Sequence, residues 1–178
     1  VQLCMPGSVT PSRVKILRAY GAELTLTDPA LFSDGAILKA QELYRQNPDK
    51  YFYADQYSNE FNWRSHFDST GPEILAQTEG RVRHFVATLG TSGTFMGVGR
   101  FLKSRDRSIQ IHEVQPDGAF HGLEGMKHME SSIVPRIYDP GLADHKLTVR
   151  TERAYRRVVD LARQEGLLVG ISSGGALD

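Results

Sequence analysis

HFVATLGTSGTFMGVGRFL, residues 84–102, is the stretch of sequence that decides the fold. Its first part, residues 84–89, is rich in apolar and β-branched side chains, which favours a strand. Residues 94–105 have the apolar spacing of a helix. The loop Gly90-Thr91-Ser92-Gly93-Thr94 joins them. Free backbone N–H groups at the start of such a helix bind anions, and glycine lets the backbone come close. From these residues alone, the loop is either a phosphate-binding loop or a tight turn without a ligand.

The residue types of this loop narrow the kind of phosphate that it could hold. The loop contains no lysine, so it is not the P-loop of a nucleotide-binding protein. Its glycines do not follow the G-x-G-x-x-G spacing of dinucleotide-binding folds. Thr91, Ser92 and Thr94 add hydroxyl donors. Neutral donors of this kind suit the fixed phosphate of a cofactor that stays bound while chemistry occurs on its ring.

Strand and helix patterns alternate on both sides of the loop. After it, strands are expected at residues 109–114, 147–150 and 167–170, with a helix at 152–165 and a long loop from Pro116 to Asp144. Before it, we expect a helix capped by Thr10, a strand at 24–26, a helix capped by Ser33, and helical structure within 62–78 that starts or restarts at Thr70. Such alternation predicts an α/β fold with a parallel sheet flanked by helices. A domain crossing is expected near residues 55–62, which gives domains 1–58 and 59–178.

Composition excludes several classes of protein and site. The chain has 178 residues, 40% of them hydrophobic, and a net charge of +0, so neither nucleic acid nor a membrane is an expected partner. The single cysteine, Cys4, allows no internal disulfide and favours a cytoplasmic location. The six histidines are scattered without metal-ligand spacing, so no metal site is expected.

The two ends of the sequence read as interrupted elements. Val1 opens what looks like the end of a buried strand, and residues 172–178 look like a turn that enters a helix. We therefore expect a piece of a longer protein, incomplete at both ends. A trimmed or disordered terminus is the alternative.

Three separated motifs resemble one enzyme family in the correct order. GTSGTFMGVGRFL, residues 90–102, is similar to the phosphate loop of the cysteine synthase (O-acetylserine sulfhydrylase) and cystathionine β-synthase family. Residues 56–74, with Gln56, Asn59, Asn62, His66 and the run TGPEI, and residues 165–174, EGLLVGISSG, resemble two further motifs of that family. The resemblance extends over nearly the whole chain. It implies the fold type II, or tryptophan synthase β-like, architecture of enzymes that use pyridoxal 5′-phosphate (PLP).

The resemblance implies which residues contact the cofactor. The PLP phosphate would be held by Gly90, Thr91, Ser92, Gly93 and Thr94. The family usually has glycine where this chain has Ser92. The hydroxyl of Ser172 would meet the pyridine nitrogen, with Ser173 as the rival, and either serine could instead be a helix N-cap. A serine at that nitrogen, where other enzymes have aspartate, favours β-elimination and β-replacement over transamination.

Two residues are implied on the substrate side. Gln56 matches the glutamine that contacts the substrate carboxylate, although an ordinary polar residue at a strand end is the alternative. Gly125 lies in residues 123–129, which resemble the flexible loop beside the substrate pocket. The family commonly has N-P-A-N where this chain has Asn59-Glu60-Phe61-Asn62, which leaves the substrate side less secure than the phosphate side.

The lysine that forms a Schiff base with PLP is absent, because none of the six lysines lies in the family's lysine motif. We therefore expect no catalytic residue in this chain, and we expect the chain alone to be inactive. The implied reaction is PLP-dependent β-replacement, which makes cysteine from O-acetylserine or a related activated serine and a sulfur donor, in a full-length homodimer. Alternatives are cystathionine β-synthase, a serine or threonine dehydratase, or an inactive PLP-fold binding module.

Overall fold

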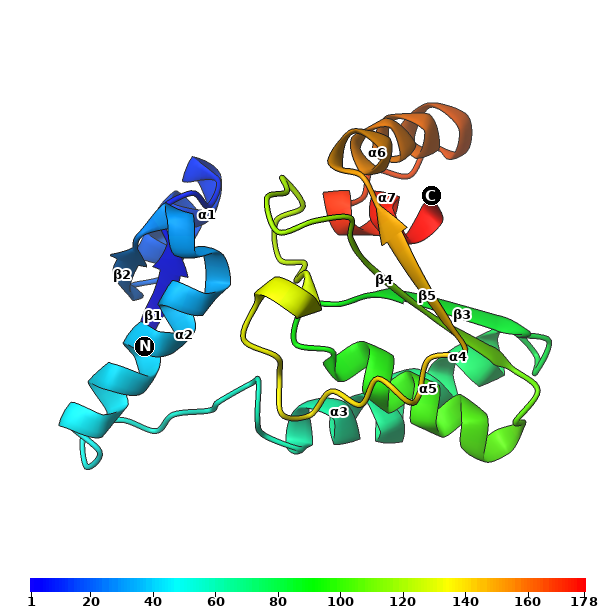
Figure 1. Ribbon diagram of the computed structural model, residues 1–178, viewed down its shortest axis with the longest axis horizontal. Helices are drawn as coiled ribbons and strands as arrows, with labels where there is room; N and C mark the ends of the chain where they lie inside the picture. The colour runs from blue at the N-terminus through cyan, green and yellow to red at the C-terminus, as the bar shows by residue number, and fades with distance from the viewer. The chain divides into compact units, whose positions relative to one another are not determined.

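The structure is a computed structural model that describes residues 1–178 and contains two compact units, Val1–Ala54 and Asp55–Asp178 (Figure 1). Each unit has its own parallel sheet. The sequence placed the crossing a few residues further along the chain, between residues 58 and 59, and that division stays a prediction about the domains of the whole protein.

The first unit is a β-α-β-α arrangement. Strands β1 (Gln2–Pro6) and β2 (Glu23–Thr27) pair in parallel, and helix α1 (Pro11–Ala19) connects them. Helix α2 (Phe32–Gln46) packs on β1 and buries Ala36 and Ile37. Thr10 is the N-cap of α1, as expected, but its side chain makes no capping hydrogen bond. The cap expected at Ser33 is wrong, because Ser33 lies inside α2. Proline at the first position of α1 fits because its missing N–H would have had no helical partner.

The second unit is built on three parallel strands in the order β3-β4-β5. These strands are β3 (His84–Thr88), β4 (Gln110–Pro116) and β5 (His145–Val149). The strand expected at residues 167–170 is wrong, since these residues are irregular and Leu167 and Leu168 are exposed. An apolar run resembles a buried strand in sequence, and within residues 1–178 no strand pairs with it.

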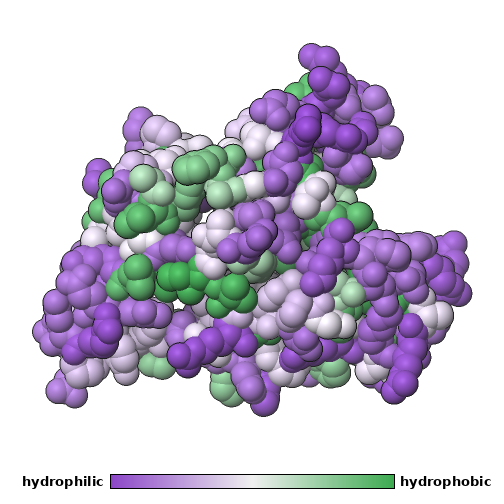
Figure 2. Space-filling model, viewed as in Figure 1, coloured by the Kyte–Doolittle hydropathy of each residue, from purple (hydrophilic) through white to green (hydrophobic).

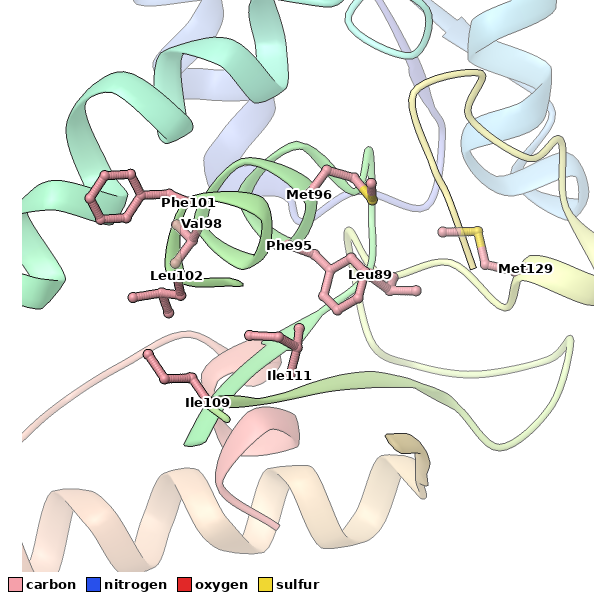
Figure 3. Packing of buried hydrophobic residues seen from close by; sticks show 9 residues of the cluster. All are labelled: Leu89, Phe95, Met96, Val98, Phe101, Leu102, Ile109, Ile111 and Met129. Carbon is pink, nitrogen blue, oxygen red and sulfur yellow. The ribbon is translucent and has the colours of Figure 1, made fainter. Parts of the chain in front are cut away.

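Helices cover both faces of this sheet (Figure 1). On one face lie α3 (Phe61–Ser65), α4 (Gly71–Gln77) and α5 (Gly93–Arg105). On the other lie α6 (Thr151–Glu165) and α7 (Ile171–Leu177), which pack on each other. Figure 3 shows the core beneath α5, whose fully buried members are Leu89, Phe95, Met96, Val98, Leu102, Ile109 and Ile111.

Helix α4 begins at the residue after Thr70, as the sequence predicted, but it continues an unbroken helical segment. A π-helical stretch, His66–Thr70, joins α3 to α4, and Thr70 has helical dihedral angles without capping a helix. Its hydroxyl instead lies 2.9 Å from Nδ1 of His66. A Cβ on Gly71 would lie 2.8 Å from the ring of Phe101, so close packing on α5 explains the glycine better than a helix start does.

Helix α6 has a strongly charged outer side, which is mostly purple in Figure 2. Its inner side contributes the buried Ala154 to a small second core with Val114, Leu123, Met126 and Val149. None of the helices in residues 1–178 is long and apolar enough to cross a membrane.

Candidate functional site

The loop Gly90-Thr91-Ser92-Gly93-Thr94 lies at the carboxyl edge of the sheet, where ligands of parallel α/β folds bind. Leu89 precedes it and still donates its N–H to Val114 O at 3.0 Å, which extends the ladder one residue beyond β3. Helix α5 begins at Gly93, one residue earlier than expected. The first backbone N–H groups of α5 therefore belong to the loop itself, as an anion site requires.

Ser92 has the least ordinary geometry of the loop. It is the N-cap of α5 and has a left-handed backbone, with φ +68° and ψ 0°. The residue is 3% exposed, and its buried Oγ has no hydrogen-bond partner. A left-handed conformation costs a residue with a Cβ about 1–2 kcal/mol, which explains why glycine suits this position. A buried hydroxyl without a partner also costs free energy, and a phosphate oxygen in the loop would remove that cost.

Asn62, from α3, supports the loop through hydrogen bonds of its side-chain amide. Its side-chain Nδ2 donates to Thr91 Oγ1 at 3.1 Å and to the main-chain oxygen of Gln56 at 2.7 Å. Thr91 Oγ1 also accepts the N–H of Gly93 at 3.3 Å. A Cβ on Gly93 would overlap Oδ1 of Asn62. One amide thus joins the expected phosphate loop to the expected substrate residue Gln56, and it requires glycine at position 93.

His66, one helical turn after Asn62, supports the other end of the loop. Its Nε2 lies 3.3 Å from Thr94 Oγ1, and its Nδ1 lies 2.9 Å from Thr70 Oγ1. The helix α3 approaches α5 closely at Gly97, where a Cβ would overlap the main-chain oxygen of Trp63. This close approach lets Asn62 and His66, spaced i and i+4, reach Thr91 and Thr94 from the same side.

Residues 125–127, which we call the Gly125 segment, lie directly against the phosphate loop. Gly125 has φ +88°, and a Cβ on Gly90 would lie 2.6 Å from the main-chain oxygen of Gly125. Lys127 donates its backbone N–H to Leu89 O at 2.7 Å. The Lys127 side chain is buried, with Nζ 5.4 Å from the ring centroid of Tyr57. Gly90 is therefore glycine because another main chain passes over it.

A buried polar network holds the rest of this long loop on β4. Glu113 is fully buried, and its carboxylate accepts from Tyr138 Oη at 2.7 Å and from Gln115 Nε2 at 2.9 Å. Gln115 Oε1 in turn accepts the backbone N–H of Met129 at 2.9 Å. Burial, and then the hydrogen bond to Glu113, raises the pKa of the Tyr138 phenol above its ordinary value. The phenol therefore stays protonated and remains a donor to Glu113.

Ser172 lies in the first turn of α7, not directly after a strand as the sequence predicted. Helix α7 packs on β3, and a Cβ on Gly175 would lie 3.5–3.6 Å from Met126 Sδ and Thr88 Cγ2. Thr88 is the last residue of β3, and Met126 follows Gly125. The helix that carries Ser172 therefore lies at the same sheet edge as the phosphate loop and the Gly125 segment. Ser172 is half-buried, and the rival residue Ser173 is exposed.

The structure brings most of the expected site residues to one edge of the sheet. Residues 90–94 and Gly125 are in direct contact, and Gln56 reaches the loop through Asn62. Sequence reasoning assigned no role to Asn62 or His66, nor did it foresee that Lys127 is buried. Two polar side chains four residues apart in a helical motif were the available signal for Asn62 and His66.

These residues fit the phosphate of a cofactor and do not fit a metal. The loop offers helix N–H groups, hydroxyls and the unpartnered oxygen of Ser92. No group of three or more His, Cys, Asp or Glu in residues 1–178 is placed to hold a metal ion. Thr91, Ser92 and Thr94 would hold the phosphate by neutral donors, with α5 supplying the favourable end of its dipole.

Comparison with known sequences supports the PLP cofactor that the motifs imply. The family described as "Pyridoxal-phosphate dependent enzyme" matches residues 1–178. The cysteine synthase of Aquifex aeolicus is 52% identical over 177 residues, which are 99% of this chain and 54% of that protein. Cysteine synthase B of Pseudomonas aeruginosa is 39% identical over 98% of this chain and 58% of that protein. The chain thus spans little more than half the length of these curated relatives.

Comparison with solved structures confirms the expected α/β fold class, the fold type II architecture of PLP-dependent enzymes. A hydrogen sulfide-producing enzyme from Fusobacterium nucleatum superimposes with a TM-score of 0.92 at 31% identity, over 99% of this chain and 61% of that one. The O-acetylserine dependent cystathionine beta-synthase from Helicobacter pylori superimposes with a TM-score of 0.91 at 30% identity, over 99% and 59%. The motif resemblance seen in the sequence is confirmed: this chain belongs to the family of pyridoxal-phosphate dependent enzymes.

Proposed function

We propose that the whole protein catalyses PLP-dependent β-replacement, in which cysteine is formed from O-acetylserine, or a related activated serine, and a sulfur donor. The observation that carries the proposal is the buried, unpartnered hydroxyl of Ser92 in a loop that Asn62 and His66 support. The relatives named cysteine synthase supply the reaction class.

In this proposal the chain supplies one side of the PLP site. Gly90, Thr91, Ser92, Gly93 and Thr94 hold the phosphate, and Ser172 meets the pyridine nitrogen. Gln56 contacts the substrate carboxylate, and the segment at Gly125 borders the substrate. When bound, PLP withdraws electrons from the α-carbon of an amino acid, and a serine at its nitrogen favours loss of a β-substituent.

We also propose that residues 1–178 alone do not turn over substrate. The family's chemistry needs a lysine that bonds to PLP and moves a proton. None of the chain's six lysines lies in the family's lysine motif. A homodimer and a cytoplasmic location remain further proposals for the whole protein.

A second candidate function is favoured by one comparison. The Helicobacter pylori structure is described as an O-acetylserine dependent cystathionine beta-synthase and resembles this chain as closely as the hydrogen sulfide-producing enzyme does. The two reactions share the activated serine and differ in the sulfur nucleophile. The residues of the phosphate loop do not distinguish them.

The test uses the whole protein with added PLP. Binding is followed by the visible absorption of the cofactor, and product is measured with O-acetylserine plus either sulfide or homocysteine. We expect bound PLP and cysteine from sulfide, whereas cystathionine as the main product would select the second function. Bound PLP with neither product would show β-replacement to be wrong, and absence of PLP binding would overturn the residue roles. Residues 1–178 assayed separately are expected to form no product, and turnover there would contradict the proposed need for an outside lysine.

A further inference from the structure

Three histidines that are far apart in the sequence form a row across the sheet of the second unit. His84 is the first residue of β3, His112 is the third of β4, and His145 is the first of β5. His112 lies directly opposite His145 in the register. Nδ1 of His84 lies 3.0 Å from Nε2 of His112, and the rings of His112 and His145 stack at 4.7 Å and 15°.

The row lies away from the proposed PLP site. The three histidines are near the amino ends of the strands, whereas the phosphate loop follows the carboxyl end of β3. They share a sheet face with Val114 and Val149, which α6 and α7 cover at the carboxyl half. Within residues 1–178, His84 and His145 are exposed and His112 is half-buried.

The spacing of two imidazole nitrogens decides what the pair can bind. With metal–nitrogen bonds of about 2.0–2.1 Å, nitrogens 3.0 Å apart subtend an angle of roughly 90–97° at a shared ion. That angle matches adjacent positions of a square-planar or tetragonal site, which Cu²⁺ and Ni²⁺ prefer, better than a tetrahedral zinc site. The two facing nitrogens form a hydrogen bond, in which one ring donates its N–H to the lone pair of the other. A neutral imidazole has one lone-pair nitrogen, so an ion can bind both only after the donating ring changes tautomer.

The neighbouring groups limit the site to these two ligands. A ring stacked on His112 cannot aim its in-plane lone pair at the same ion, and Nε2 of His145 lies 3.3 Å from Gln110 Oε1. The carboxylate of Asp144 accepts from Lys103 Nζ and from the N–H of Ile111, both at 2.7 Å. No third His, Cys, Asp or Glu in residues 1–178 completes a cluster. Without a carboxylate ligand, the pair does not suit Mg²⁺ or Ca²⁺.

We propose that His84 Nδ1 and His112 Nε2 form a two-imidazole site for Cu²⁺ or Ni²⁺, with water in the remaining positions. His145 is a positioning residue that stacks on His112 and fixes the plane of its ring. This metal site is independent of the proposed cofactor chemistry, because it contains none of residues 90–94. Strand pairing places three of the six histidines side by side, which their spacing in the sequence does not indicate.

The test measures Cu²⁺ binding to the purified protein with Cys4→Ser as the background, so that the thiol does not compete. Calorimetry gives the affinity, and electron paramagnetic resonance reports how many nitrogens bind the ion. We expect two coordinating nitrogens, affinity in the order Cu²⁺ above Ni²⁺ above Zn²⁺, and a loss of at least about tenfold in His84→Gln or His112→Gln. His128→Gln, a matched change of a histidine outside the row, should bind as the background protein does.

Each result bears on the proposal. Absence of Cu²⁺ binding, or unchanged affinity in both His84→Gln and His112→Gln, would overturn it. A loss in His145→Gln as large as in His112→Gln, with three coordinating nitrogens in the background protein, would show that the two-ligand assignment is wrong. Circular dichroism checks folding, and His84→Gln at the exposed first residue of β3 carries the test if His112→Gln unfolds.

Discussion

The side-chain amide of Asn62 donates to Thr91 Oγ1 at 3.1 Å, across 29 positions of the sequence. The same amide donates to the main-chain oxygen of Gln56 at 2.7 Å. Asn62 thus ties the first turn of α3 to the loop before α5 and to the turn that carries Gln56.

Removal of this amide should loosen the loop. For Asn62→Ala we expect the free energy of unfolding to fall by about 1–3 kcal/mol, because the acceptors that it satisfies lose a donor. We also expect weaker PLP binding by the whole protein. Arg64→Ala, which breaks an exposed ion pair with Glu60, the N-cap residue of α3, is the control and should change stability by about 1 kcal/mol or less. Equal PLP affinity in Asn62→Ala and wild type would argue against a supporting role.

Gly93→Ala should destabilise the protein, because Asn62 leaves no room for a methyl group at position 93. A methyl group at position 93 would overlap Asn62 Oδ1, so we expect a loss of at least about 1–3 kcal/mol in chemical denaturation. The double variant with Asn62→Ala should recover part of this loss, because the obstructing oxygen is gone. Gly118→Ala, where a Cβ meets nothing within 4 Å and φ is not positive, is the control. Strictly additive effects of the two changes would contradict the contact.

Substitutions of Ser92 should change stability and cofactor binding in opposite directions. Ser92→Gly should raise the stability of the cofactor-free protein by about 1–2 kcal/mol, because glycine tolerates φ +68°. Ser92→Ala should also be more stable than wild type without cofactor, because it removes the buried hydroxyl that has no partner. Both variants should bind PLP less tightly if that hydroxyl donates to the phosphate. Thermal melts and PLP titrations measure the two quantities, and unchanged PLP affinity would assign no such bond to Ser92.

Asp144 should make stability depend on acid pH. The hydrogen bond from Lys103, followed by the one from the Ile111 N–H, lowers the pKa of the Asp144 carboxyl. A lowered pKa in the folded state means that the stabilisation is complete above the unfolded value and is lost as pH falls through the folded value. The difference in unfolding free energy between wild type and Asp144→Asn should therefore shrink as pH falls from 5 to about 2. A difference that stays constant over that range would contradict the assignment.

Ser172→Asp tests the residue expected at the pyridine nitrogen. If Ser172 meets that nitrogen in the whole protein, a carboxylate there should hold a proton on it and shift the product pattern away from β-replacement. Product analysis with O-acetylserine and sulfide checks this, with Ser173→Asp as the matched control on the neighbouring exposed residue. If the two variants behave alike, Ser172 has no special position.

The sequence predicted what depends on local pattern and missed what depends on neighbours. The strand, loop and helix of residues 84–105 were predicted almost to the residue, because alternation, glycine and helical spacing act locally. The strand expected at residues 167–170 was wrong, because a run of leucines does not reveal whether a partner strand lies beside it. Helix α4 does begin at Gly71, directly after Thr70, but the expected cap is wrong, because the Thr70 hydroxyl contacts His66 Nδ1 instead.

The candidate site also combines features that the sequence predicted with features that depend on packing. Residues 90–94 could be found from the sequence because a helix start binds anions whatever surrounds it. The support from Asn62 and His66, and the contact between Gly90 and Gly125, depend on how α3 and the long loop pack. The left-handed backbone of Ser92 was also hidden, since serine in sequence gives no sign of positive φ.

Leu89 is a single residue that connects the two halves of the proposed site. Its N–H bonds to Val114 O, its C=O accepts from Lys127 N, and the phosphate loop begins at the next residue. A displacement of the Gly125 segment would therefore reach the phosphate loop through this hydrogen bond and through the contact of the Gly125 main chain with Gly90. Because binding free energies are reciprocal, ordering of the segment tightens cofactor binding by the same factor by which the cofactor orders the segment, if the cofactor orders it at all.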